Sequence, residues 1–202
     1  APCAALAATG AAALLCADAF SGLFHWATDN YGDGRTPGLG AVIAAFQGHH
    51  LAPWTIAHRP FANNVHKICA AVLPLVLLAA APSLRRGGGG LALFFWTVFL
   101  NAQWASQEFH KWTHTPREQV PALARWAQRR GLILTPREHG LHHRAPFDQR
   151  YCILTGACNA PLDAWRVFRR LEYAVWRATG AEPNCWKLDP QLREETIRSG
   201  FR

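Results

Sequence analysis

Three apolar runs dominate the chain, at residues 4–24, 65–81 and 91–105. The first has about the 20 residues that an α-helix needs to cross a lipid bilayer. Asp18 interrupts this run, and a carboxylate is costly in hydrocarbon unless it faces other protein. The second and third runs flank a glycine-rich stretch at residues 83–90, which we predict to be the turn of an antiparallel helical hairpin.

Weaker patterns predict further helices and leave two alternatives open. The second apolar run is interrupted before residue 68, so a buried helix of a soluble protein is the alternative to a membrane span there. A helix bounded by prolines is predicted at residues 120–130. Apolar residues recur every three or four positions from 161 to 178, which predicts a helix that either lies in a membrane interface or packs on its own domain. The polar tail after residue 180 predicts no particular structure.

These patterns predict an all-α fold: an integral membrane helical bundle in a single domain that covers residues 1–202. Composition agrees, because half of the residues are hydrophobic and only 17% are charged. From Lys111 onward, 16 Lys and Arg stand against 9 Asp and Glu, so we expect this half to lie on an anionic surface. No nucleic-acid partner is expected, because these arginines alternate with apolar residues at helical spacing.

Other residue types add two expectations. The six cysteines form no CxxC pair and are expected to stay reduced. The sequence has no methionine, not even an initiator, so we expect it to begin inside the encoded protein, with any targeting segment outside it.

Eight of the ten histidines, together with one aspartate, are candidate metal ligands. Within each cluster the spacing places the side chains together, on one face of a helix or next to each other. Imidazole suits iron, zinc and copper. One ion needs about four ligands, so nine candidates predict two metal ions. The clusters are His25 with Asp29, His49 with His50, His110 with His114, and His139 with His142 and His143.

The clusters lie at the ends of the apolar runs, which predicts a topology. If residues 83–90 form the turn of the hairpin, every cluster lies on the opposite face of the bilayer from this turn. The excess of basic residues places that face on the cytoplasmic or stromal side. Just before the second cluster, Gly48 is expected to allow a close approach of the backbone to a metal.

Six motifs carry a resemblance to a known family. They are HWATDNYGD at residues 25–33, FQGHH with PWTI at 46–56, FANNVH at 61–66, FHKWTH at 109–114, EHGLHH at 138–143 and YCILTGACN at 151–159. They resemble the Kua-type lipid desaturases, which include animal plasmanylethanolamine desaturases and the plastid enzymes that place a trans Δ3 double bond in palmitate on phosphatidylglycerol. The wording of the first three motifs is closer to the plastid branch.

The resemblance implies a membrane fatty acid desaturase with two iron ions and O2 as co-substrate. The eight clustered histidines would be its catalytic metal ligands, with Asp29 as the ninth. The substrate would be a membrane glycerolipid, and ferredoxin would supply electrons in a chloroplast membrane. The other branch implies vinyl-ether formation in the endoplasmic reticulum, with cytochrome b5 as donor. A non-catalytic membrane metal-binding protein stays the alternative.

Two further sets of residues are candidates for supporting roles. Four polar side chains either orient the imidazoles or cap turns and helices: Asn63, Asn64, Asn159 and Asp163. Four arginines near the clusters either hold an anionic lipid headgroup or anchor the protein in the interface: Arg35, Arg59, Arg144 and Arg150. A soluble zinc hydrolase and a ferritin-like bundle are disfavoured, because the sequence has neither HExxH nor Glu-x-x-His motifs.

Overall fold

The computed structural model describes residues 2–85 and 89–201, and in these residues the chain forms helices and no strands. The prediction of an all-α fold is therefore confirmed. The elements are α1 (Pro2–Asn30), α2 (Gly40–Leu51), the 3₁₀-helix η1 (Pro53–His58), α3 (Phe61–Arg85), α4 (Gly89–His114), α5 (Ala122–Arg129), α6 (Pro136–His142), α7 (Asn159–Ala164), α8 (Val167–Thr179), α9 (Asn184–Leu188) and α10 (Pro190–Ser199).

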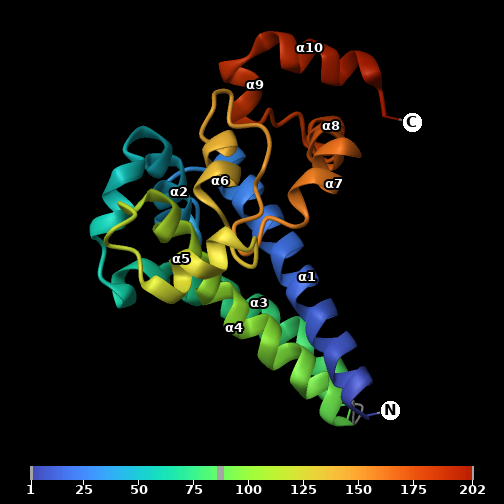
Figure 1. Ribbon diagram of the computed structural model, residues 1–202. Helices are drawn as coiled ribbons and strands as arrows, with labels where there is room; N and C mark the ends of the chain where they lie inside the picture. The colour runs from blue at the N-terminus through green and yellow to red at the C-terminus, as the bar shows by residue number, and fades with distance from the viewer. Residues whose placement is uncertain (1, 86–88, 202) are drawn as a thin grey trace.

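Helices α1, α3 and α4 run side by side and form an elongated bundle, here called the stalk (Figure 1). Each contains one of the three apolar runs. The remaining elements gather at one end of the stalk and form the head. The N-terminus, the C-terminal end of α3 and the N-terminal end of α4 lie at the far end of the stalk. The helical hairpin therefore runs in the predicted direction.

The predicted turn at residues 83–90 is too long. Helix α3 continues through Arg85 and α4 already begins at Gly89, while residues 86–88 lie outside the described part of the chain. Ser, Leu and Arg are all tolerated in the last turn of a helix. Gly89 has a φ of 65°, a left-handed conformation that glycine adopts at little cost.

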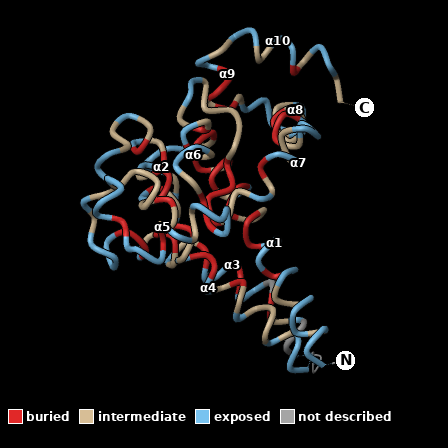
Figure 2. Tube along the Cα trace, in the orientation of Figure 1, coloured by how far each residue is buried: buried red, intermediate tan, exposed pale blue. Residues whose placement is uncertain are grey.

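Two helices of the stalk are long and apolar enough to cross a membrane: α1, and α3 from Phe61 to Pro82. In the most apolar 18-residue stretch of each helix, only 17% of the α1 stretch and 31% of the α3 stretch is buried. Figure 2 shows that buried residues gather where the stalk meets the head, while the far end of the stalk is mostly exposed or intermediate. A core helix of a soluble protein would be mostly buried, and a large apolar surface is unfavourable in water. This exposure favours association with a membrane over the soluble alternative.

One polar face of α1 binds an extended segment of the head at residues 151–158. Asp18 is fully buried there: its Oδ1 accepts hydrogen bonds from the backbone N–H of Thr155 at 2.7 Å and Gly156 at 3.0 Å, and its Oδ2 accepts one from Cys158 at 2.9 Å. One turn further on, Ser21 Oγ accepts from Ile153 N at 3.1 Å. Asp18 thus faces protein, which removes the cost of a carboxylate in an apolar run.

The single helix predicted for residues 161–178 is in fact two, α7 and α8. They are separated at Arg166, which has a φ of 53°. The apolar face of α8 packs against Trp26 and Tyr151, so this helix packs on its own domain. Its residue Glu172 is fully buried and pairs with Arg169.

The C-terminal tail, for which the sequence predicts no particular structure, is ordered around the same carboxylate. Glu172 accepts hydrogen bonds from the indole N–H of Trp26 at 3.1 Å and of Trp186 at 2.9 Å. The tail also holds the end of α1, since Asn184 Nδ2 donates to the Asp29 carbonyl at 2.7 Å. The residues after 180 thus help to fix the helix that carries His25 and Asp29.

Glu172→Ala is expected to destabilise the protein, because it removes the nearest carboxylate from the buried guanidinium of Arg169 and leaves only Asp148, at 3.7 Å. Removal of one partner from a buried ion pair costs about 3–5 kcal/mol. Thermal unfolding of the purified protein in detergent, followed by circular dichroism, measures this loss as a lower melting temperature. Glu195→Ala, at an exposed position, is the matched control and should leave the melting temperature unchanged. Equal melting temperatures for the two variants would contradict the structural role of Glu172.

Candidate metal centre

The nine candidate ligands converge in two groups where the stalk meets the head. His49, His110, His114, His139 and His143 form the five-histidine group, and His25, Asp29, His50 and His142 form the aspartate group. Within each group, the potential ligand atoms all lie within 4.8 Å of one another. Helix α1 supplies two of the nine residues, α2 two, α4 two and α6 two, and His143 follows α6 directly.

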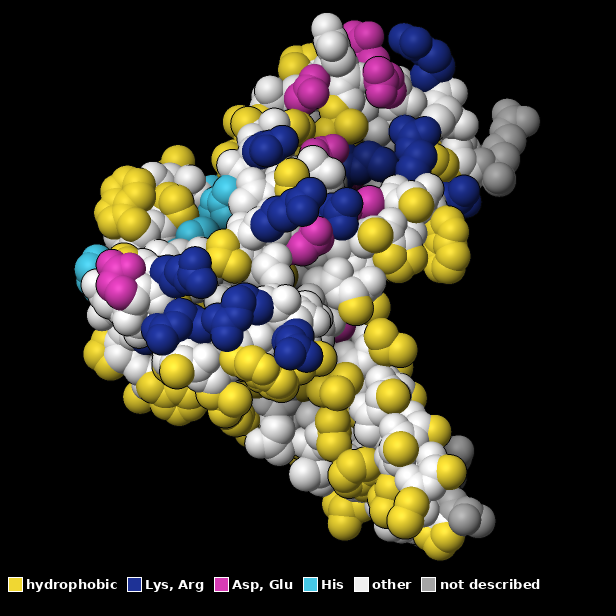
Figure 3. Space-filling model, viewed as in Figure 1, with side chains coloured by type: hydrophobic (Ala, Val, Ile, Leu, Met, Phe, Trp, Pro, Cys, Tyr) yellow, Lys and Arg dark blue, Asp and Glu magenta, His cyan; other side chains and the backbone are white. Residues whose placement is uncertain are grey.

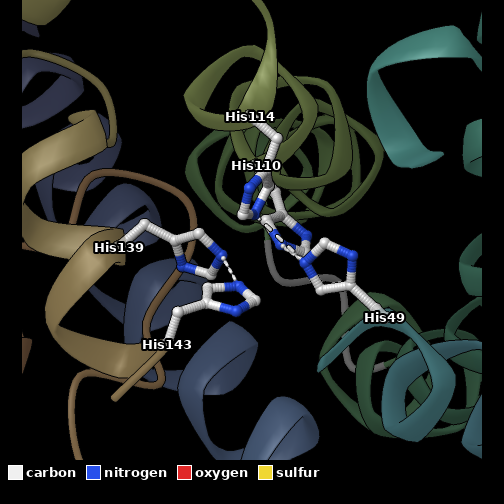
Figure 4. A group of neighbouring side chains, drawn as sticks. All are labelled: His49, His110, His114, His139 and His143. Carbon is white, nitrogen blue, oxygen red and sulfur yellow. Dashed lines mark hydrogen bonds between the residues drawn. The ribbon is translucent and has the colours of Figure 1, made fainter. Parts of the chain in front are cut away.

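In the five-histidine group, the rings point toward one another from α2, α4 and the end of α6 (Figure 4). The Nε2 atom of His49 lies 3.1 Å from that of His114 and 3.0 Å from that of His110. The Nε2 atoms of His139 and His143 are 2.9 Å apart.

In the aspartate group, one carboxylate oxygen lies close to three imidazoles. Asp29 Oδ2 is 3.2 Å from His25 Nε2, 3.4 Å from His50 Nε2 and 3.5 Å from His142 Nε2. The Nε2 atoms of His50 and His142 are 3.1 Å apart. Because α1 is helical through Asn30, His25 and Asp29 lie one turn apart on the same face.

These separations fit ligands that share an ion. With metal–nitrogen bonds of about 2.0–2.1 Å, neighbouring ligands of a tetrahedral or octahedral ion lie about 3.0–3.4 Å apart. Three of the potential ligand atoms are also unpaired: among the described residues, His25 Nε2 and both oxygens of Asp29 have no hydrogen-bond partner. A buried acceptor without a partner costs about 1–3 kcal/mol, and a bound cation removes this cost.

Backbone carbonyls set the orientation of two rings. His25 Nδ1 donates to the Tyr151 carbonyl over 3.0 Å, and His142 Nδ1 donates to the Gln149 carbonyl over 2.9 Å. A proton on Nδ1 leaves the lone pair on Nε2, which is the atom that faces the other ligands. The carbonyls thereby fix the tautomer that a metal requires.

The histidines of α2 and α6 are held in the neutral form. Burial lowers the pKa of His49 and His143 from 6.5 to about 2, and the neighbouring imidazoles lower it further. Burial also lowers the pKa of His50 and His142, to about 4. These imidazoles are unprotonated at neutral pH, and the neutral ring is the form that binds metals.

None of the four polar side chains proposed to orient the imidazoles does so directly in the described structure. Asn159 comes closest, because it bonds both the N–H and the carbonyl of Cys152, next to Tyr151. Asn64 donates to Glu108 Oε1 at 2.8 Å, Asn63 is exposed, and Asp163 pairs with Arg150. Backbone carbonyls hold the rings instead, and a sequence pattern carries no signal for them.

The four arginines proposed for the lipid headgroup differ in their surroundings. Arg150 pairs with Glu138 at 3.0 Å and with Asp163 at 3.1 Å, so its charge is already compensated and it is an unsuitable phosphate ligand. Arg35 pairs with Asp33 at 3.0 Å, and Arg144 is exposed. Arg59 lines a pocket that also contains His49 and His110.

A close approach between two protein segments occurs at Gly22, whereas the approach to a metal at Gly48 stays a prediction. Gly48 lies inside α2, and a Cβ atom there would have no neighbour within 4 Å. At Gly22, a Cβ atom would lie 2.5 Å from Cys152 Sγ and 3.2 Å from Cys152 N. Glycine is therefore required where α1 meets the segment that orients His25.

Comparison with known proteins agrees with this centre. Residues 14–186 match the family described as lipid desaturase domain, so the chain belongs to this family. It is 41% identical over 184 residues to fatty acid desaturase 4, chloroplastic, of Arabidopsis thaliana. This alignment covers 89% of this chain and 54% of the relative. It is 34% identical over 170 residues to plasmanylethanolamine desaturase of Myxococcus xanthus, with 84% and 60% covered.

A mouse relative extends the second comparison. Plasmanylethanolamine desaturase 1 of Mus musculus is 32% identical over 180 residues, with 86% of this chain and 66% of the relative covered. The chain thus spans about half to two thirds of the length of these relatives. No solved structure matches it.

The two groups predict how metal is lost when one ligand is removed. The purified protein should contain about two metal ions per chain by inductively coupled plasma mass spectrometry. His25→Ala should reduce this to about one, because the aspartate group keeps only three ligands while the five-histidine group stays complete. His66→Ala, at an exposed histidine outside both groups, should keep two. Loss of both ions in His25→Ala, or one ion in the unsubstituted protein, would contradict two separate sites.

Gly22→Ala should weaken the centre without removing a ligand, because the added methyl group pushes α1 away from Cys152. Overpacking of this kind costs about 1–3 kcal/mol. Thermal unfolding and metal content should both fall. Gly10→Ala in the same helix is the control: its Cβ atom would lie 3.4 Å from Phe94, an ordinary contact, and alanine favours the helix by about 0.5–1 kcal/mol. If Gly22→Ala is as stable as Gly10→Ala, the close approach has no structural importance.

Proposed function

We propose that this protein is a membrane fatty acid desaturase with two iron ions. It removes two vicinal hydrogens from the acyl chain of a glycerolipid, with O2 and two electrons from a donor. The observation that carries this proposal is the convergence of nine potential ligands, six buried and three half-buried, in two adjacent groups at the end of an apolar stalk. Membership of the lipid desaturase family supports it.

The reaction determines which metals are suitable. An unactivated C–H bond is too strong for acid–base chemistry, so the bound metal ions must supply oxidising power together with O2. Zinc has no redox chemistry, and imidazole ligands suit iron. The contribution of the protein is to hold eight neutral imidazoles and one carboxylate in place, and to exclude water from them by burial.

The position of the centre supports desaturation close to the headgroup. The ligands lie where the apolar stalk enters the head, which is the level of the membrane interface if the stalk spans the bilayer (Figure 1). The first carbons of an acyl chain lie at this level, and its middle does not. Together with the similarity to fatty acid desaturase 4, this favours a trans double bond at carbon 3 of palmitate on phosphatidylglycerol.

The location is proposed from the names of the relatives, and the electron donor from the resemblance of the sequence motifs. We infer a chloroplast membrane, with the head on the stromal side and ferredoxin as donor. Lys and Arg side chains gather over the head in Figure 3, and a basic surface suits an acidic electron carrier. Similarity to plasmanylethanolamine desaturases keeps a second candidate: formation of a vinyl ether in the endoplasmic reticulum, with cytochrome b5 as donor.

Expression in a host that contains phosphatidylglycerol and a suitable electron donor tests the activity. Mass spectrometry of the extracted lipids should show a new double bond at carbon 3 of palmitate in phosphatidylglycerol, formed only in the presence of O2. His110→Ala should abolish the product while the protein is still present in the membrane, and His66→Ala should keep it. A double bond only at mid-chain, or only as a vinyl ether in ethanolamine lipids, would show that the proposed substrate is wrong. No new double bond at all would count against a desaturase.

A further inference from the structure

Two pockets reach the metal centre, and they differ in chemistry. The first lies among α2, η1, α3 and α4 and contacts the five-histidine group through His49 and His110. The cavity volume open to a water-sized sphere is about 30 Å³, so the pocket is a narrow opening between these side chains. The second contacts the aspartate group through Asp29 and His50 and is lined on its other side by residues of α9 and of the loop after α6. We call them the five-histidine pocket and the aspartate pocket.

The inner wall of the five-histidine pocket is apolar. Val42, Phe46, Ile56 and Ile68 line it, and each of these side chains is at least nine-tenths buried. They come from α2, η1 and α3 and belong to the surroundings of two metal-ligating imidazoles. An apolar chain fits such a wall, because contact with it removes hydrocarbon from water.

Two cations line the same pocket. Arg59 follows η1 and Lys67 lies on α3, and both are half-buried. The backbone of Arg59 is held in place, because Lys111 Nζ donates a hydrogen bond to the Arg59 carbonyl oxygen over 2.7 Å. In contrast to Arg35 and Arg150, neither Arg59 nor Lys67 has a carboxylate partner among the described residues. Their charges are available for an anionic ligand.

The pocket lies at the depth where a phospholipid changes from headgroup to acyl chain. Lys67 and Ile68 are on the second turn of α3, at the head end of the segment Phe61–Pro82 that is long enough to cross a membrane. The phosphate of a phospholipid and the first carbons of its chains lie at the corresponding level of a bilayer.

We propose that the five-histidine pocket is the substrate site, in which Arg59 and Lys67 hold the phosphate of an anionic glycerolipid and the apolar wall guides its acyl chain to His49 and His110. This assignment rests on the proposed function and adds to it that the five-histidine group faces the substrate. The aspartate pocket does not suit the same ligand, since Asp29 is its charged lining residue and no Lys or Arg lines its described part.

Lipid binding by the purified full chain in detergent tests the proposal without the need for turnover. The probes are dioctanoyl-phosphatidylglycerol and dioctanoyl-phosphatidylcholine, which share their acyl chains but differ in net charge. We expect at least about tenfold tighter binding of the anionic lipid, and Arg59→Gln with Lys67→Gln should abolish this preference while binding of phosphatidylcholine is unchanged. Arg177→Gln, at an exposed position of α8 outside the pocket, should behave as the unsubstituted protein.

A second pair of variants tests the route of the acyl chain. Ala45→Phe places a ring in the pocket and should weaken binding of both lipids about tenfold or more. Ala41→Phe, at an exposed position of the same helix, should leave both affinities unchanged. Metal content is measured for every variant, and it should stay at the level of the unsubstituted protein.

The outcomes separate this proposal from the enzyme assignment. If the double variant keeps the preference for phosphatidylglycerol, Arg59 and Lys67 do not hold the phosphate. If it loses both lipids equally, the two cations support the fold of the pocket and recognise no headgroup. If Ala45→Phe binds both lipids normally, the acyl chain enters elsewhere. Each result overturns the proposal, and none depends on whether the protein desaturates the bound lipid.

Discussion

The structure depends on one electrostatic constraint: nine potential ligand side chains, six buried and three half-buried, bring their ligand atoms close together in two groups. Imidazole Nε2 atoms about 3 Å apart would repel if protonated, and burial away from water makes the unpaired lone pairs costly. A cation bound in each group would remove both penalties. Four helices from distant parts of the chain must therefore end at one point, and the arrangement of stalk and head follows from that requirement.

Helix α1 connects the ligand groups to the rest of the fold. Asp18, Ser21, His25 and Asp29 recur every three or four residues along one buried face. The first three bind the backbone of residues 151–158, while Asp29 faces the other ligands and its carbonyl is held by Asn184. The opposite side of the helix is apolar and exposed along the stalk. A single helix thus combines a membrane-facing surface with a polar face that orders the metal centre.

The ligands could be predicted from the sequence because their spacing is local. Histidines at i, i+3 and i+4 share a helix face whatever the surrounding fold, and their positions at the ends of apolar runs predicted that they lie together. The carbonyls of Tyr151 and Gln149 could not be predicted, since every residue has a carbonyl and only tertiary structure selects two of them.

Other features of the fold were beyond the sequence for similar reasons. The left-handed conformation of Arg166 breaks a helix that periodicity alone makes continuous, and an arginine gives no warning of it. Trp186 and Glu172 meet only after the chain has folded back on α1, so the tail resembled an ordinary polar segment.

The central claim is that the nine ligands form two adjacent metal sites. Anomalous X-ray diffraction at the iron edge from crystals of the purified protein tests it most directly. Two anomalous peaks are expected, one among the Nε2 atoms of the five-histidine group and one beside Asp29; a single peak, or peaks away from both groups, would contradict it.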